Sequence, residues 1–187
     1  MVQTPNKPLT LDEFLELPET KPAQEYVNGK ITQKPMPQGK HSRIQGKLVS
    51  IIETLGTESS LAIAFPELRC TFGERSIVPD VVVLQWERIP RDKNGDIANI
   101  CLTYPDWTIE ILSPNQNTIK VTGNIIHCLN HGSNLGWLID PETQSVLVFI
   151  PQQTPQLLEN SEDILPTPEF LPKLTLTVGD IFSWLKV

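Results

Sequence analysis

The chain has 187 residues and a mass of 21.0 kDa, a size that suits one domain with a short appended element. Its composition, 39% hydrophobic and 20% charged residues, excludes a disordered chain, and the 17 prolines between apolar runs exclude a helical bundle. A net charge of −7 excludes a polycation that coats nucleic acid without specificity.

The first part of the chain predicts a short helix, a hairpin and a long helix. Thr10-Leu11-Asp12-Glu13 is a capping box that opens a helix through Leu17. Asn28-Gly29 suits the type I′ turn of a two-residue hairpin. Apolar residues at helical spacing over 41–55 indicate an amphipathic helix, with Gly56 placed as its C-terminal stop.

The rest of the chain predicts short strands that alternate with helices. The order strand, helix, strand near residue 120 indicates a crossover connection and parallel or mixed pairing. The fold class is therefore α/β, a mixed sheet flanked by helices. In chain order we expect an antiparallel meander over 61–65, 67–72 and 77–84, a surface loop over 87–104, a strand over 107–112, a helix over 118–131, strands over 136–140 and 146–150, an irregular tail over 152–173 and a closing helix over 178–185.

The cysteines and the termini bear on the compartment. Cys70, Cys101 and Cys128 are far apart and form no Cys-x-x-Cys pair, which predicts neither a disulfide framework nor a zinc ribbon. The N-terminus lacks the apolar segment of a signal peptide, and no apolar run approaches the roughly 18 residues of a membrane helix. We expect a soluble protein in the reducing cytoplasm.

Positive charge is concentrated in one stretch of the chain. No acidic residue occurs between residues 31 and 52, whereas Lys34, Lys40, Arg43 and Lys47 all lie there. One interpretation is a basic face on an acidic body, which would meet nucleic acid. The other is a solvated helix face that happens to carry lysines.

Several familiar catalytic motifs are absent. The chain has neither G-x-G-x-x-G nor G-x-x-x-x-G-K-[ST], so no phosphate-binding loop is predicted. Gly132-Ser133-Asn134-Leu135-Gly136 lacks the central serine of a nucleophile elbow. His127 and His131 are four residues apart, but Cys128 stands where the zinc motif H-E-x-x-H has glutamate.

Two carboxylates remain as candidates for chemistry. Asp80 and Glu110 each interrupt a run of apolar strand residues, where a charge is costly unless it is paired or binds a cation. A small set of oxygen ligands suits Mg²⁺ or Mn²⁺, which keep water and meet substrate phosphates. The alternative is that each acid faces solvent at a sheet edge or a loop mouth.

A polar stripe lies on the helix that follows Glu110. Lys120, Asn124, His127 and His131 are spaced so that they share one helix face. Lys120 lies in the first turn, near the strand end that carries Glu110, where an ammonium could neutralise phosphate charge or position water. The alternative is an ordinary solvated lysine.

Five segments of the chain resemble one family. They are Pro79-Asp80, Glu110-Ile111-Leu112-Ser113-Pro114 and Trp137-Leu138-Ile139-Asp140-Pro141, together with Glu25-Tyr26-Val27-Asn28-Gly29-Lys30 and Met36-Pro37 before His41. With them the chain resembles the Uma-type restriction endonucleases of the PD-(D/E)XK nuclease superfamily, over residues 10–185.

The resemblance implies a four-stranded mixed core sheet with helices on both sides and metal-dependent hydrolysis of phosphodiester bonds. It matches Asp80 and Glu110 to the two motif acids. The superfamily lysine would fall at Leu112, and the helix position that this family uses corresponds to Asn124. Lys120, one turn earlier on the same face, is the natural substitute.

We therefore predict a Mg²⁺-dependent DNA endonuclease, or one that uses Mn²⁺, in a restriction-endonuclease-like domain. Asp80 and Glu110 would hold the metal, and Lys120 would steady the nucleophile or the scissile phosphate. The alternative is a module of the same fold that binds nucleic acid or protein without cleaving it, or an interaction protein without catalysis. The single domain would span 1–187, with the N-terminal helix and hairpin in 1–35, the nuclease core in 41–150 and an extension in 151–187.

The resemblance and the basic stretch also predict contacts around this centre. Backbone phosphates would meet the side chains of the first long helix, and a homodimer is expected because one compact site cuts one strand at a time. The predicted phosphate contacts are Lys40, Arg43 and Lys47, and the accessory positions are Glu25, His41 and Asn124.

Overall fold

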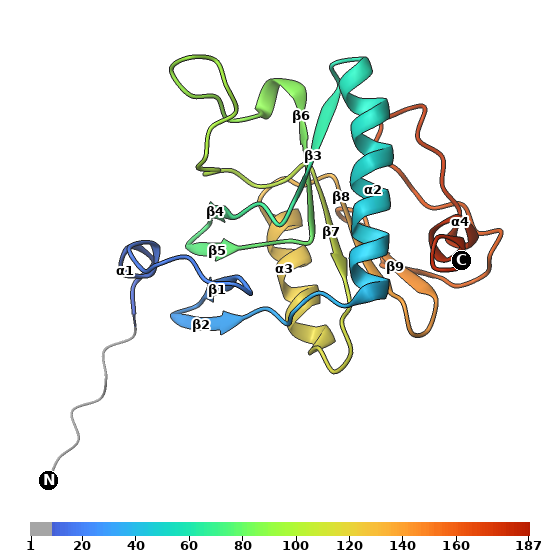
Figure 1. Ribbon diagram of the computed structural model, residues 1–187, viewed down its shortest axis with the longest axis horizontal. Coiled ribbons are helices and arrows are strands. Elements are labelled where there is room, and N and C mark those ends of the chain that lie inside the picture. The colour runs from blue at the N-terminus through green and yellow to red at the C-terminus, as the bar shows by residue number, and fades with distance from the viewer. Residues whose placement is uncertain (1–8) are drawn as a thin grey trace, which may run out of the picture.

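A mixed six-stranded sheet carries the main hydrophobic core of residues 9–187, the part of the chain that the computed structural model describes (Figure 1). Strands β7 (Trp107–Ile111) and β8 (Leu135–Asp140) are parallel and are joined by helix α3 (Thr118–Asn130). All other neighbouring strands of this sheet are antiparallel. The predicted crossover is therefore confirmed. The strand order is β10 (Gln156–Leu158), β9 (Ser145–Phe149), β8 (Leu135–Asp140), β7 (Trp107–Ile111), β6 (Val81–Gln85) and β3 (Ala62–Pro66).

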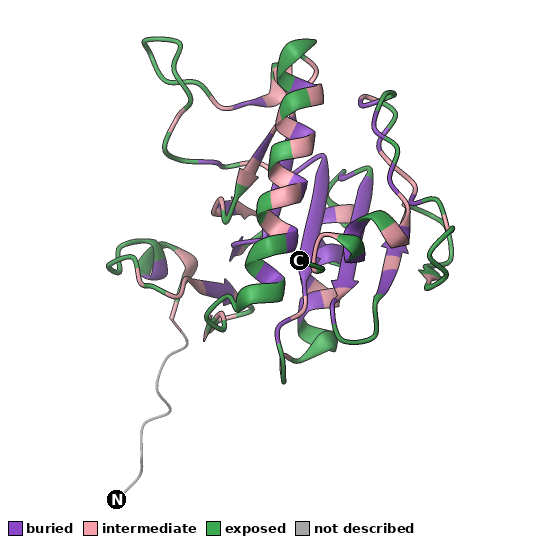
Figure 2. Ribbon diagram, turned by 45° about the vertical axis from the view of Figure 1, so that its right-hand side comes forward, coloured by how far each residue is buried: buried purple, intermediate pink, exposed green. Residues whose placement is uncertain are grey.

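The sheet is wider than the four strands that the resemblance implies. The chain continues past β8 and adds β9 and β10, so part of the tail expected to be irregular pairs with the sheet. Helices cover both faces, and Figure 2 shows the central strands buried between them. From α2 (Gly39–Glu58) the side chains of Ile44, Leu48 and Ile52 are fully buried against one face, and α3 packs on the other.

Helix α2 continues past Gly56 to Glu58, so the prediction that the helix stops at Gly56 is wrong. A side chain at Gly56 would overlap the backbone of Ala62 at the start of β3. Glycine is needed at this position because the helix and the edge strand approach closely there, and not because the helix ends.

A second sheet lies beside the first and corrects the predicted meander. Its order is β2-β1-β5-β4, and β4 and β5 join the N-terminal hairpin instead of pairing with β3 or β6. The predicted turn at Asn28-Gly29 is confirmed, with positive φ at both residues. Gly73 and Glu74 form a second such turn. The strands are β1 (Gln24–Val27), β2 (Lys30–Gln33), β4 (Cys70–Phe72) and β5 (Arg75–Ile77).

The two short helices begin at capping boxes. The Thr10 hydroxyl accepts a hydrogen bond from the Glu13 backbone N–H and opens α1 (Leu11–Leu15), as predicted. Thr177 does the same for α4 (Val178–Ser183). A 3₁₀ helix, η1 (Trp86–Arg88), begins the 87–104 loop. The three cysteines are free thiols, and within residues 9–187 no helix has the length and hydrophobicity that a bilayer crossing requires.

The contact between α3 and β8 gives a test of the fold. A methyl group on Gly136 would overlap Ile125, so we expect Gly136→Ala to destabilise the protein by about 1–3 kcal/mol through overpacking. Gly46 lies exposed in α2 with open space around it, so Gly46→Ala should stabilise by about 0.5–1 kcal/mol. Urea unfolding of both variants measures the difference, and equal effects would contradict the close approach.

Candidate functional site

The two acids singled out in the sequence meet at the pairing of β6 with β7. Asp80 directly precedes β6, and Glu110 lies in β7, whose residue Ile109 pairs with Val81. Asp80 is 2% exposed and Glu110 is 1% exposed. Neither acid therefore faces solvent at a sheet edge.

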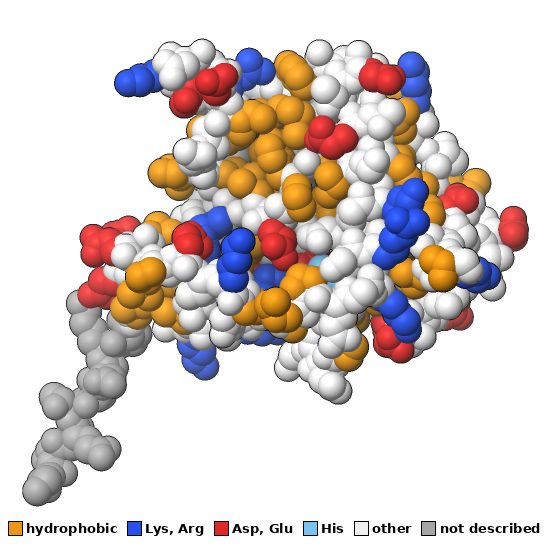
Figure 3. Space-filling model, in the orientation of Figure 1, with side chains coloured by type: hydrophobic (Ala, Val, Ile, Leu, Met, Phe, Trp, Pro, Cys, Tyr) orange, Lys and Arg blue, Asp and Glu red, His pale blue; other side chains and the backbone are white. Residues whose placement is uncertain are grey.

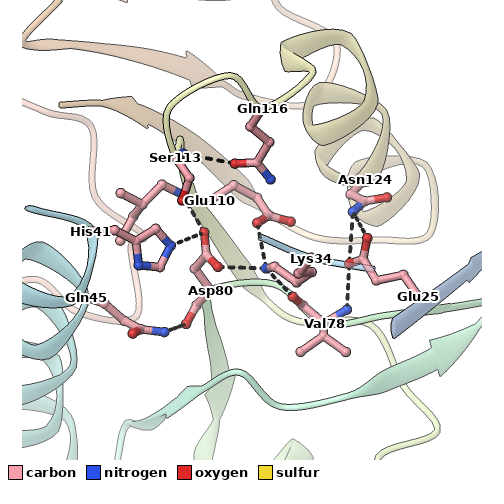
Figure 4. Close-up of polar contacts among 11 residues, drawn as sticks. Glu25, Lys34, His41, Gln45, Val78, Asp80, Glu110, Ser113, Gln116 and Asn124 are labelled. Carbon is pink, nitrogen blue, oxygen red and sulfur yellow. Dashed lines mark hydrogen bonds and ion pairs between the residues drawn. The ribbon is translucent and has the colours of Figure 1, made fainter. Parts of the chain in front are cut away.

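A lysine that the sequence analysis did not place at the site joins these acids. The Lys34 ammonium donates to Asp80 Oδ1 at 2.7 Å and to the Val78 carbonyl at 2.6 Å, and it lies 3.4 Å from Glu110 Oε2 (Figure 4). Lys34 directly follows β2, so the second sheet supplies this cation. Its contacts span 46 and 76 residues of sequence, and no local spacing connects them.

Helix α2 orients Asp80 from the other side. His41, in the first turn, places Nε2 3.1 Å from Asp80 Oδ2, and the Ile111 backbone N–H donates to the same oxygen at 2.7 Å. The Gln45 side chain donates to the Asp80 carbonyl at 2.8 Å. These contacts fix the carboxylate, as groups around a metal ligand do.

The predicted accessory residues Glu25 and Asn124 form a pair of their own. Glu25, in β1, accepts hydrogen bonds from the Val78 backbone N–H at 2.9 Å and from the Asn124 amide at 3.2 Å. Both side chains are buried. Asn124 therefore holds Glu25 in place at the edge of the site.

The polar stripe on α3 divides between two places. Lys120 and Asn124 line a cavity of about 370 Å³ together with Lys34 and Glu110, and Lys120 is exposed. The two histidines lie further along, against the β4–β5 turn, where His127 stacks on Phe72. Burial lowers the pKa of His127 to about 4, so this ring is neutral near pH 7 and structural in character.

Leu112 shows why the superfamily lysine position is unused in this chain. Its side chain packs against the apolar cluster between α3 and the sheet, together with Val121 and Ile125. An ammonium at this position would enter that cluster and not the cavity.

The charges of the central three groups depend on one another. Burial raises the pKa of Glu110 well above its usual range, although Lys34 opposes the shift. Burial disfavours charge on Asp80 as well, but Lys34 and His41 hold its pKa below the usual range. Burial also opposes the charge of Lys34, yet Glu110, Asp80 and Glu25 together raise its pKa. The site thus favours a charged Lys34 beside an ionised Asp80, and Glu110 holds a proton more readily than an exposed glutamate does.

The donor set fits a hard divalent cation. Glu110 Oε1 is buried and has no hydrogen-bond partner among the described residues, which leaves an acceptor for a cation or a proton. Within residues 9–187 no three His, Cys, Asp or Glu side chains gather as a metal site. A Mg²⁺ ion at Asp80 and Glu110 would therefore complete its coordination with water, backbone or substrate oxygens.

The basic residues of α2 lie outside the cavity. Lys40 forms an exposed ion pair with Glu142 at 2.8 Å, and the Arg43 side chain donates to the Trp184 carbonyl at 3.1 Å. The Lys47 side chain forms no hydrogen bond or ion pair with the described residues. Figure 3 shows basic side chains near the N-terminal part of α2.

The raised pKa of Glu110 makes stability depend on pH. The folded state holds this proton more tightly than the unfolded chain, whose glutamates titrate at about 4.3, so wild-type stability falls as pH rises through the folded pKa. Glu110→Gln removes this loss, so its stability relative to wild type should rise as the pH increases above about 4.3. Asp80, with its lowered pKa, stays ionised in that range. Urea unfolding at several pH values in the presence of EDTA measures this difference. Equal pH dependence of the unfolding free energy in wild type and Glu110→Gln would contradict the raised pKa of Glu110.

Comparisons with known proteins show which family the chain belongs to. A family model described as "Putative restriction endonuclease", Uma2, matches residues 11–179. Among solved structures the chain is similar to the crystal structure of "a putative nuclease belonging to DUF820" from Anabaena variabilis, with 58% identity, a TM-score of 0.94, and coverage of 95% of this chain and 99% of that chain. No curated protein matched. The resemblance found in the sequence is confirmed, and the chain belongs to the Uma2 family.

Proposed function

We propose that the protein is a metal-dependent endonuclease that hydrolyses phosphodiester bonds in DNA. The observation that carries this proposal is the pair of buried acids, Asp80 just before β6 and Glu110 in β7. Both contact the ammonium of Lys34, which lines an open cavity together with Glu110. Buried carboxylates held this close are costly for the fold, and a divalent cation is the ligand that their oxygens suit. The family and the related crystal structure, both described as nucleases, support the same chemistry.

Each residue would have a definite part in this reaction. Asp80 and Glu110 would hold Mg²⁺ or Mn²⁺, which when bound lowers the pKa of water and offsets charge on the phosphate. His41 and the Ile111 N–H keep Asp80 in one orientation. Glu25 accepts hydrogen bonds from Asn124 and from the Val78 backbone N–H, and so fixes the backbone two residues before Asp80.

DNA would approach along the cavity and α2. Lys120 stands exposed at the cavity rim, in reach of an incoming phosphate. Lys40, Arg43 and Lys47 follow on α2 and would contact the backbone, which fixes position without reading sequence. These side chains would give the DNA-facing surface a local positive charge, although the whole chain has a net charge of −7.

A homodimer belongs to this proposal because cleavage of both DNA strands calls for two copies of one site. The loop after β6 carries three exposed apolar side chains, Ile97, Ile100 and Leu102. Figure 3 shows apolar surface between this loop and β3. Sedimentation at micromolar concentration distinguishes the dimer from a monomer limited to nicking.

A second candidate is a non-cleaving binding module of the same fold. The buried amide of Asn124, at the family's lysine position, favours it. In that case wild type would show no metal-dependent nicking, and Asn124→Lys would restore some. A pure interaction protein would show neither cleavage nor a change of melting temperature with divalent metal.

The acids give the direct test of cleavage. We expect Asp80→Asn and Glu110→Gln each to lower Mg²⁺-dependent nicking of supercoiled plasmid by about 10²-fold or more, because each removes a charge that acts in the transition state. Glu87→Gln, an exposed acid beyond the opposite end of β6, is the matched control and should retain activity. Wild-type rates in either site variant would exclude the acid pair from catalysis.

Lys120 tests the DNA path. If the exposed Lys120 contacts a DNA phosphate, Lys120→Ala should weaken DNA binding. It should also reduce the slope of log affinity against log salt concentration by about one. Lys93→Ala, an exposed lysine in the 87–104 loop, controls for general charge. Unchanged affinity with a cleavage rate about 10²-fold lower would instead place Lys120 at the reacting phosphate.

A further inference from the structure

The Lys34 ammonium has the surroundings of a bound cation. Its side chain is only 9% exposed, and its partners are three oxygens, the Val78 carbonyl, Asp80 Oδ1 and Glu110 Oε2. An ammonium has three N–H donors, so these oxygens use its full capacity. Figure 4 shows the end of the Lys34 side chain next to both acids, with dashed lines to Asp80, Glu110 and Val78.

Two neighbouring buried carboxylates are costly in a folded protein. When both are ionised they repel each other and lose hydration, a cost that a cation or a proton has to offset. Lys34 is the described side chain that contacts both acids. Its presence explains how the site keeps its shape before any metal arrives.

We propose that Lys34 is a resident counter-cation that holds Asp80 and Glu110 together in the metal-free protein and yields its place at Glu110 to the divalent cation. The inference rests on the proposed function, since it takes these acids to be the metal ligands. Lys34 and the metal then compete for the same negative charge.

The contact distances indicate which contact yields. Lys34 is 2.7 Å from Asp80 but 3.4 Å from Glu110, so the bond to Glu110 is the weaker one. Glu110 also has its second oxygen, Oε1, without a partner. A flexible lysine stem allows the ammonium to turn from Glu110 into the cavity that both residues line. There it would stand beside a substrate phosphate and serve as the lysine that positions 112 and 124 do not supply.

The test measures metal binding without DNA. Mn²⁺ titration by calorimetry should show at least about tenfold tighter binding to Lys34→Met than to wild type, because a positive charge beside the acids is gone. Lys34→Gln, which keeps a hydrogen-bond donor, should show the same gain. Lys34→Arg keeps the charge and should not bind more tightly. Lys30→Met is the matched control, because it removes an exposed lysine at the start of β2, the strand that directly precedes Lys34.

Activity completes the signature. Lys34→Met and Lys34→Gln should cleave plasmid about 10²-fold more slowly than wild type despite binding Mn²⁺ more tightly. A misfolded variant cannot bind the metal more tightly, so a folding defect cannot imitate this result. Equal or weaker Mn²⁺ binding by both variants, or wild-type cleavage, would overturn the role of Lys34 and leave the proposed function standing. A wild-type protein that binds no Mn²⁺ would overturn both.

Discussion

The contact of one lysine with two buried acids joins the two sheets of this protein. The main sheet brings Asp80 and Glu110, and the second sheet brings Lys34 at the end of β2. Loss of the Lys34 charge would leave the buried Asp80 carboxylate without its ammonium partner, a defect that costs about 3–5 kcal/mol in buried pairs. The site is therefore a structural junction between the two sheets, so charge-removing variants need a stability measurement beside the activity.

The sequence predicts well those features that depend on residues close together along the chain. The Asn28-Gly29 turn, the capping boxes and the α3 crossover follow from local spacing, and the acids are visible because each interrupts an apolar run. The site of Lys34 is not visible in this way, since its partners lie 46 and 76 residues away. The β4–β5 hairpin differs from the predicted meander for a similar reason. The residues of a short strand do not indicate which sheet the strand joins.

The helix α3 shows how one periodic stripe can hold two kinds of residue. Lys120 and Asn124 border the cavity, while His127 and His131 pack beneath the β4–β5 turn against Phe72. Helical period places all four on one face but does not say what covers that face. The second sheet covers only its later part, so Lys120 stays exposed at the cavity while His127 is buried against Phe72.

Two basic residues of α2, Lys40 and Arg43, contact residues that come after β8 in the chain, which bears on how DNA could use them. An exposed ion pair such as Lys40 with Glu142 contributes only about 0–1 kcal/mol, because solvent screens it. Counterion release from DNA offers each new phosphate contact a comparable or larger gain at low salt. Lys40 can therefore exchange Glu142 for a phosphate at little cost. The buried contacts of Lys34 with Asp80 and Glu110 have no such screening, so a charge that enters the cavity has to compete with them directly.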